Sequence, residues 1–278
     1  MEKILLAIDA MKPDTKSLDF ACYIANLTKS KVTGVFLENL VSTENPEKIL
    51  SRSPYDEADI EGNYSIAEIR EECCEENIKG FKEACEGRGV AYSIHRDRSV
   101  PAIEMIEESR FADMIIIDAE TSFAKKYEGS PTAFVKDVLA DAECPVVIPP
   151  HNFYGIHEIV FTYNGSKSSV FAIKQFTYLL PQFNNKKAII LQVNKENDTT
   201  VKGKYKLKEW LKAHYSNIDI VLLEGDSRYK LFDYILKQKN AFIVMGAYGR
   251  NMMANFFSGS HADFIVKVID LPVFIAHY

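Results

Sequence analysis

Residues 242–262 read FIVMGAYGRNMMANFFSGSHA: an apolar run, a glycine-punctuated loop and the start of a helix-like stretch. The loop reduces to G-x2-G-x9-G-S, with Gly246, Gly249 and Gly259-Ser260 as its fixed points. Glycine permits tight turns and close backbone approach, and the start of a helix offers free N–H groups and the positive end of a dipole. The stretch therefore predicts a phosphate-binding turn at the carboxyl edge of a parallel sheet. A glycine-rich turn with a serine helix cap is the plainer alternative.

The rest of the chain repeats one plan twice. Short apolar runs alternate with stretches in which apolar residues recur at helical spacing. The predicted strands are 4–8, 32–37, 91–95, 114–117 and 146–148, then 159–163, 188–193, 218–223, 242–245 and 273–275. The predicted helices are 17–27, 66–86, 102–109 and 133–140, then 168–180, 202–214, 228–237 and 262–268. This alternation predicts an α/β fold of two tandem domains, each with a five-stranded parallel sheet flanked by helices.

The two copies meet near residue 150. Pro149-Pro150 favours an extended connection, so we expect domains at residues 1–150 and 151–278. Each copy ends in an apolar strand at a sheet edge, and exposed edges invite pairing. We therefore expect Val146–Ile148 to pair with Val273–Ile275 in an internal pseudo-dimer, and a homodimer is a further option.

The first copy carries extra residues. From Asp9 to Gly129 the chain runs 120 residues, against 95 from Asn164 to Gly259. The excess falls around residues 39–63, which are rich in Glu, Asp, Ser and Pro. That composition predicts a tolerated surface insertion, with a lid or a partner-binding segment as the alternative.

Charge differs in sign between the two copies. Residues 1–150 hold 17 Lys+Arg and 29 Asp+Glu, a net charge of −12, whereas residues 151–278 hold 16 and 10, a net charge of +6. A positive half attracts an anion such as a nucleotide, and the plainer alternative is that the halves attract each other or differ in solvated surface. There is no run of ~18 apolar residues and no signal peptide, and the five cysteines are irregularly spaced. We expect a cytoplasmic protein without a membrane partner.

Other functional signatures are missing from the sequence. It contains no G-x4-G-K-[ST], no G-x-G-x-x-G and no G-x-S-x-G, which disfavours P-loop, dinucleotide and serine-hydrolase chemistry. The six histidines show no metal-ligand spacing, so no metal is expected. The alternate lysines of residues 202–212 do not share one helix face, which favours a solvated surface over a nucleic-acid site. Glutamates around Cys73-Cys74 disfavour a reactive thiol.

Taken together, these motifs resemble the universal stress proteins in their tandem two-domain form, over nearly the whole chain. The resemblance rests on the G-x2-G-x9-G-S loop, on the strand endings Asp9 and Asn164-Gly165-Ser166, and on the strand Leu191-Gln192-Val193. Two further segments look like the last strand of that family: Cys144-Pro145-Val146-Val147-Ile148 and Leu271-Pro272-Val273-Phe274-Ile275. The resemblance implies Rossmann-like domains of the adenine nucleotide alpha hydrolase type, and ATP or a related adenine nucleotide as the ligand.

The resemblance also implies a set of binding residues in the second half. Gly246, Gly249, Arg250, Gly259, Ser260 and His261 would surround ribose and phosphates. Thr162, Tyr163, Asn164 and Val193 would flank the base and ribose, and Met245 and Ala262 complete the set. Asn164 departs from the Asp that usually ends this strand in the family; it keeps hydrogen-bonding capacity but carries no charge.

The first half departs further from the motif. Asp118 and Thr121 replace the first two glycines, and Asp118 lies 11 positions before Gly129, against 13 between Gly246 and Gly259. Asp118 and Glu120 would repel phosphate. We therefore expect a degenerate first domain that binds no ATP. A role in dimerisation, or a site for another ligand such as a cation at Asp118 and Glu120, stays open.

The function implied is that of an ATP-binding stress-response module rather than a fast enzyme, because no placed general base or metal-binding carboxylate is apparent. Slow ATP hydrolysis or autophosphorylation stays compatible with it. A nucleotide-free scaffold that binds a partner or ligand is one alternative, and an adenylate-chemistry enzyme on the same fold is another. No nucleic acid is expected as a partner.

Overall fold

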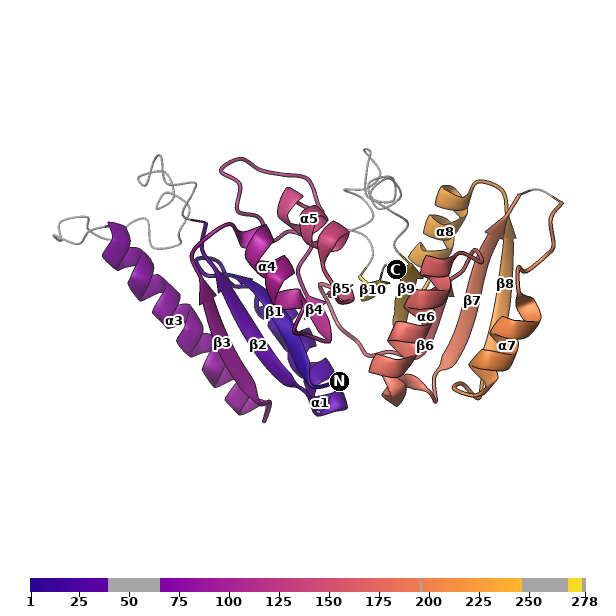
Figure 1. Ribbon diagram of the computed structural model, residues 1–278, viewed down its shortest axis with the longest axis horizontal. Coiled ribbons are helices and arrows are strands. Elements are labelled where there is room, and N and C mark those ends of the chain that lie inside the picture. The colour runs from indigo at the N-terminus through magenta and orange to yellow at the C-terminus, as the bar shows by residue number, and fades with distance from the viewer. Residues whose placement is uncertain (40–65, 196, 247–269, 277–278) are drawn as a thin grey trace.

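The computed structural model describes residues 1–39, 66–195, 197–246 and 270–276. Its strands form one ten-stranded sheet in the order β3-β2-β1-β4-β5-β10-β9-β6-β7-β8. Figure 1 shows the two halves side by side, with β3 and β8 at the outer ends and β5 and β10 at the centre. Each half repeats the same strand order outward from the seam, the junction of β5 and β10. This is the α/β architecture that the alternating pattern predicts.

Both halves run strand, helix, strand along the chain. The first contains β1 (Lys3–Asp9), α1 (Thr15–Thr28), β2 (Lys31–Leu37), α3 (Ile66–Gly87), β3 (Tyr92–Asp97), α4 (Pro101–Ser109), β4 (Met114–Ile116), α5 (Ala133–Asp141) and β5 (Val146–Ile148). The second contains β6 (Glu158–Thr162), α6 (Lys167–Leu179), the short 3-10 helix η2 (Pro181–Phe183), β7 (Lys187–Asn194), α7 (Lys204–Lys212), β8 (Ile218–Glu224), α8 (Ser227–Leu236), β9 (Ala241–Gly246) and β10 (Val273–Ala276).

Side-chain caps mark where several helices begin. Asp14 precedes α1, and its carboxylate accepts hydrogen bonds from the backbone N–H groups of Lys16 and Ser17. Thr132 and Ser166 cap α5 and α6 in the same way, through their hydroxyl groups. These caps satisfy N–H groups that have no partner inside the helix, which is why such residues signal a helix start in the sequence.

The two half-sheets join through their last strands. β5 and β10 pair antiparallel, with Val146 opposite Ile275, Val147 opposite Phe274 and Ile148 opposite Val273. Within each half the described strand pairs are parallel. The pairing expected between the two terminal strands is therefore confirmed, and each strand covers an edge that the other half would otherwise expose.

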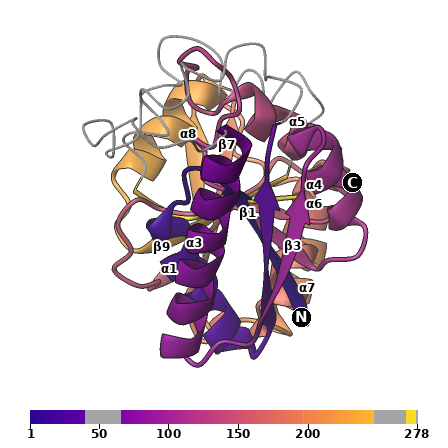
Figure 2. The same cartoon turned by 90° about the vertical axis from the view of Figure 1, so that its left-hand side faces the viewer.

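The core lies on both faces of the sheet. One face is covered by α1, α3, α6 and α7 and carries a continuous apolar cluster that spans the seam. The other face is covered by α4 and α5 in the first half and by α8 in the second. In Figure 2, α3 stands on one side of the first-half strands and α4 and α5 on the other. Across the seam, Phe20 of α1 meets Phe242 of β9 at 6.3 Å between ring centroids.

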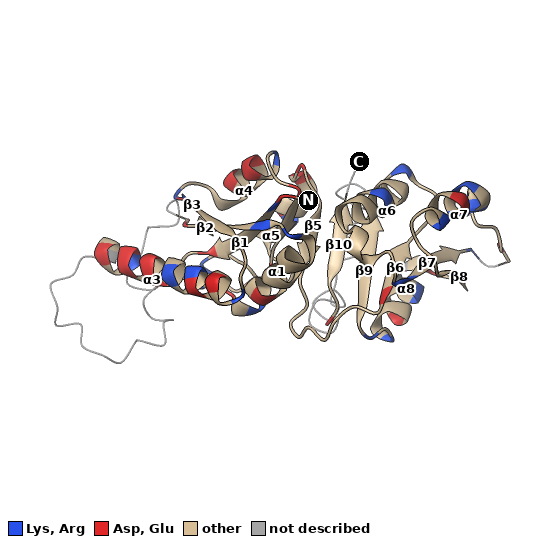
Figure 3. Cartoon of the chain, turned by 90° about the horizontal axis from the view of Figure 1, so that it is seen from below, with Lys and Arg blue, Asp and Glu red and all other residues tan. Residues whose placement is uncertain are grey.

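The structure reproduces the predicted elements with small shifts at their ends. The helix expected at 202–214 begins at Lys204, because Gly203 adopts a left-handed backbone with φ of 64°. η2 was not predicted. The helix expected at 262–268 and most of the insertion expected at 39–63 lie outside the described residues. Figure 3 colours the ribbon by charge: acidic positions are frequent on α3 and α4, and basic positions lie on α6 and α7.

Within the part of the chain that the structure describes, no helix combines the length and the apolarity that a membrane crossing requires.

Candidate functional site

The strand order predicts where a ligand would bind in each half. In the second half, β6 lies between β7 and β9. The segment that follows β6 runs into α6, which covers one face of the sheet. The segment that leads into β9 comes from α8, which covers the other face. Ligands of open parallel sheets bind outside the carboxyl ends of two such strands, where the connections diverge. The carboxyl ends of β6 and β9 therefore define the candidate site in the second half.

Three predicted residues leave β6 at this point. The Thr162 hydroxyl donates to the Val244 carbonyl oxygen at 3.2 Å, which ties β6 to β9. Tyr163 is buried, and its hydroxyl donates to the Lys202 carbonyl oxygen at 2.6 Å. Asn164 is exposed, and its Oδ1 accepts from the Ser166 N–H at 3.0 Å in a turn that leads into α6. Tyr163 thus packs in the core, whereas Thr162 and Asn164 lie at the carboxyl end of β6, where a ligand would bind.

Met245 and Gly246 end β9 beside them, and both are buried. A Cβ built on Gly246 would lie 2.4 Å from the Ser168 carbonyl carbon and 2.6 Å from the Ser169 backbone nitrogen. The first turn of α6 therefore packs directly on this glycine. This contact accounts for a glycine at position 246 by packing within the protein, and the approach of phosphate to the loop stays a prediction.

Val193 lies near the end of β7, half-buried, opposite Leu223 of β8. Its neighbour Gln192 is 3% exposed, and its Nε2 donates to Asn194 Oδ1 and to the Thr200 carbonyl oxygen. Gln192 Oε1 is buried without a hydrogen-bond partner in the structure. The sequence placed Gln192 on this strand but gave no sign of its buried polar network, because that network joins it to a loop beyond the strand.

The structure thus brings part of the predicted set together. Thr162, Asn164, Val193, Met245 and Gly246 share the carboxyl edge of β6, β7 and β9. The rest of the predicted set lies outside the described residues: Gly249, Arg250, Gly259, Ser260, His261 and Ala262.

The corresponding loop of the first half closes on itself. The Ser130 hydroxyl donates to the Ala119 carbonyl oxygen at 3.3 Å, and the Thr132 N–H donates to the same oxygen at 3.2 Å. The Thr132 hydroxyl in turn donates to the Thr121 carbonyl oxygen at 2.5 Å. Donors at the start of α5 are therefore bound to the loop's own carbonyl groups. Burial raises the pKa of Asp118, whose Oδ1 accepts from the Glu120 N–H at 2.6 Å.

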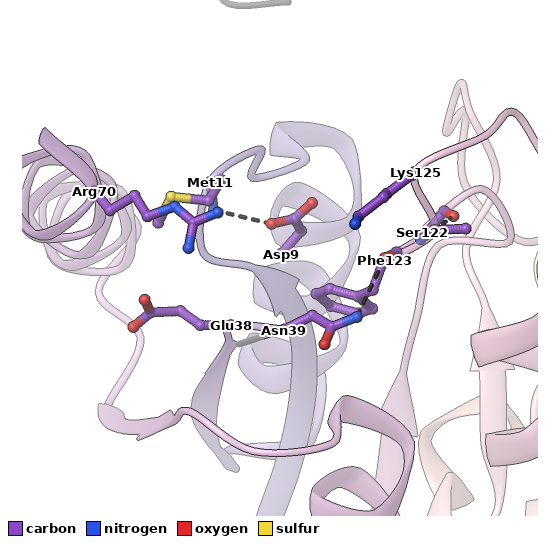
Figure 4. A pocket seen from close by; sticks show the side chains of 9 residues that line it. Asp9, Met11, Glu38, Asn39, Arg70, Ser122, Phe123 and Lys125 are labelled. Carbon is purple, nitrogen blue, oxygen red and sulfur yellow. Dashed lines mark hydrogen bonds between the residues drawn. The ribbon is translucent and has the colours of Figure 1, made fainter. Parts of the chain in front are cut away.

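An open cavity of about 160 Å³ lies at the carboxyl ends of the first-half strands. It is lined by Asp9, Met11, Glu38, Asn39, Arg70, Ser122, Phe123, Ala124 and Lys125. Figure 4 shows Arg70 and Lys125 reaching in from opposite sides, with Asp9 between them in that view. Sequence reasoning noted Asp9 but missed the other charged residues, because they come from segments far apart along the chain.

The environment of Cys73 and Cys74 fits the expectation of unreactive thiols, but the main reason is burial rather than the nearby glutamates. The pKa of Cys74 is raised to about 11, mainly by burial, with nearby glutamates as smaller contributions. The pKa of Cys73 is raised as well, again mainly by burial. The sequence had indicated the glutamates as the main cause.

Comparison with known proteins places this fold. No protein-family model matches the sequence, and no curated protein matches it. A universal stress protein from Archaeoglobus fulgidus matches 99% of this chain and 96% of its own at a TM-score of 0.71 and 19% identity. A Pseudomonas aeruginosa structure assigned to the universal stress proteins matches 100% of this chain and 93% of its own at a TM-score of 0.57 and 13% identity.

The chain therefore has the α/β fold of the universal stress proteins over its whole length, which confirms at the level of the fold the resemblance carried by its motifs. A universal stress protein from Arabidopsis thaliana with AMP bound matches 52% of this chain and 89% of its own, at a TM-score of 0.36 and 12% identity. A match that weak carries no argument about the ligand of this chain.

Proposed function

We propose that this protein is a universal stress protein that binds ATP, or a related adenine nucleotide, at the carboxyl edge of β6, β7 and β9. The observation that carries the proposal is the junction of β6 and β9. There Gly246 opens a G-x2-G-x9-G-S loop at the point where ligands of parallel sheets bind. If the helix predicted at 262–268 forms, this loop and the start of that helix would supply N–H groups for phosphate.

The described residues fit a nucleotide. Val193, half-buried near the end of β7, offers apolar surface, which suits the face of a base. Asn164 and Thr162 offer polar groups at the same edge, and the Asn164 amide nitrogen is a donor. The net charge of +6 in the second half favours an anionic ligand.

The proposed role is a nucleotide-dependent binding module in the stress response, located in the cytoplasm and not a fast enzyme. The nucleotide would switch the surface that the module presents to a partner. Slow hydrolysis is compatible with this role, because a binding module needs no rapid turnover.

The test measures ATP binding by calorimetry in the full chain and in Gly259→Val. Because a valine side chain would fill the place where phosphate approaches the loop, we expect the variant to lose at least tenfold in affinity, about 1.4 kcal/mol. Gly80→Val is the matched control, since a Cβ at Gly80 meets nothing within 4 Å. Unchanged ATP affinity in Gly259→Val contradicts the proposed site.

Nucleotide content of freshly purified protein separates the alternatives. Adenine nucleotide released on denaturation supports the module. Absence of nucleotide together with no thermal shift on adding ATP favours a scaffold. Pyrophosphate release in the presence of an acceptor favours an adenylate-chemistry enzyme.

A further inference from the structure

The first-half cavity presents three charged groups that form no ion pair with another described residue. Among the described residues, Arg70 on α3 and Lys125 after β4 form no hydrogen bond or ion pair through their charged groups. Asp9, at the end of β1, accepts a backbone hydrogen bond from Met11 at 2.9 Å and forms no ion pair with a described residue. Burial raises the pKa of Asp9, against the opposing effect of the nearby Lys12 charge. The three groups converge on one cavity from different elements (Figure 4).

The fourth charged residue of the cavity is already neutralised. Glu38 is 8% exposed, and its Oε1 accepts from Arg96 Nε at 2.8 Å and from Arg98 Nε at 3.1 Å. Two guanidinium groups therefore hold this carboxylate against the end of β2. The charges left for a ligand are those of Arg70, Asp9 and Lys125, in the order positive, negative, positive in the view of Figure 4.

A complementary ligand carries the opposite order: anion, cation, anion. We propose that this cavity binds a small dicarboxylate with an ammonium group between its two acidic ends, the charge arrangement of an acidic amino acid. The ammonium group would meet Asp9, and the two carboxylates would meet Arg70 and Lys125. Met11 and Phe123 supply apolar surface for the methylene groups of such a ligand.

The volume of the cavity and the negative charge of the first half both favour this ligand class over a nucleotide. The cavity of about 160 Å³ is well below the roughly 300–1,000 Å³ of pockets that hold drug-sized ligands. The first half carries a net charge of −12, which repels a polyphosphate more strongly than a zwitterion of net charge −1. The neighbouring loop, closed through Ala119, Ser130 and Thr132, has already used donors that a phosphate would need.

The experiment is calorimetric titration of the full chain at low ionic strength, because Lys125 is exposed and its attraction is screened by salt. The probes are L-glutamate, L-aspartate and three analogues that each lack one charge of glutamate: glutarate, γ-aminobutyrate and L-glutamine. We expect glutamate or aspartate to bind once per chain. Taking glutamate as the reference, we expect each analogue to bind at least tenfold more weakly.

Single substitutions assign the three contacts. Arg70→Gln, Lys125→Gln and Asp9→Asn should each weaken the binding of the acidic amino acid at least tenfold. Asp9→Asn should also remove the preference for glutamate over glutarate, because it removes the partner of the ammonium group while keeping an oxygen for the Met11 N–H. Lys82→Gln, on the exposed face of α3, is the matched control and should change nothing.

Three results would overturn the proposal. One is the absence of binding by both acidic amino acids up to about 10 mM. Another is equal affinity for glutamate and glutarate in the unmodified protein. The third is displacement of a bound acidic amino acid by ATP at one equivalent, which would make the cavity a nucleotide site. Melting temperatures of all variants show that losses of binding are not losses of fold.

Discussion

Asp118 follows β4 at the position that Gly246 occupies after β9, and its environment is costly for a carboxylate. Burial raises its pKa above the ordinary value of 3.8, against a backbone hydrogen bond from Glu120 that lowers it. A carboxyl whose pKa is higher in the folded state binds protons more tightly when folded. The protein therefore loses stability as pH rises from 3.8 through the folded-state pKa of this group.

Asp118→Asn should remove that cost and keep the Oδ1 acceptor. We expect the free energy of unfolding at pH 7 to rise by roughly 0.5–1 kcal/mol, since the group is only partly buried. The gain should shrink as pH falls toward 3.8, where the native carboxyl is protonated. Urea denaturation at both pH values measures it, with the exposed Asp137→Asn as control. A variant less stable than the native protein at pH 7 would contradict this account.

Single residues also show which parts of the candidate nucleotide site and of the first-half cavity could be predicted from the sequence. The pattern after β9 predicted a glycine turn for phosphate at Gly246, whereas the structure shows the backbone of α6 packed against this glycine, a contact that the pattern did not indicate. The cavity of Asp9, Arg70 and Lys125 could not be predicted, because no spacing in the sequence links a strand end, a distant helix and a loop. Tertiary folding alone brings their charges together.

At the scale of elements the sequence was more informative, because periodicity and breakers are local. Buried parallel strands read as short apolar runs, and β4, β5 and β9 were found within one residue of each end. The prolines before β5 and β10 marked where those strands begin. The predicted start of the helix at residue 202 was wrong by two residues, because Gly203, with φ of 64°, sets the start of α7 at Lys204.

The seam between β5 and β10 has a register that chemistry can test. Val146 faces Ile275, and directly opposed residues of antiparallel strands have Cα atoms about 4.5–5.5 Å apart, which is within disulfide range. Val146→Cys with Ile275→Cys should therefore form a disulfide within the chain on mild oxidation, detected by peptide mapping. Val146→Cys with Val273→Cys is the control, because Val273 faces Ile148. A disulfide in the control pair at equal yield would show that the register is different.

For the whole molecule, the two halves share one architecture but differ at their carboxyl edges. The strand order outward from the junction of β5 and β10 is identical, so each half has the same candidate position for a ligand at its carboxyl edge. The second half keeps the full glycine spacing and a net charge of +6, whereas the first has a closed loop, a carboxylate at Asp118 and a net charge of −12. The two halves therefore share one scaffold, and we infer that their loops give them different ligands, with the nucleotide bound in the second half.

This division predicts that ATP titration of the full chain gives a stoichiometry near one. At ~4 Å and an effective dielectric near 20, repulsion between a phosphate charge and a carboxylate such as Asp118 costs on the order of 4 kcal/mol, more than the ~1 kcal/mol that a helix dipole contributes. Asp118→Asn should not create a second site, because Ser130 and Thr132 still donate to the Ala119 carbonyl oxygen. Calorimetry of both proteins measures the number of sites. Two equivalent sites in the native chain would show that the closed loop does not exclude phosphate, whereas a second site only in Asp118→Asn would show that charge alone excludes it.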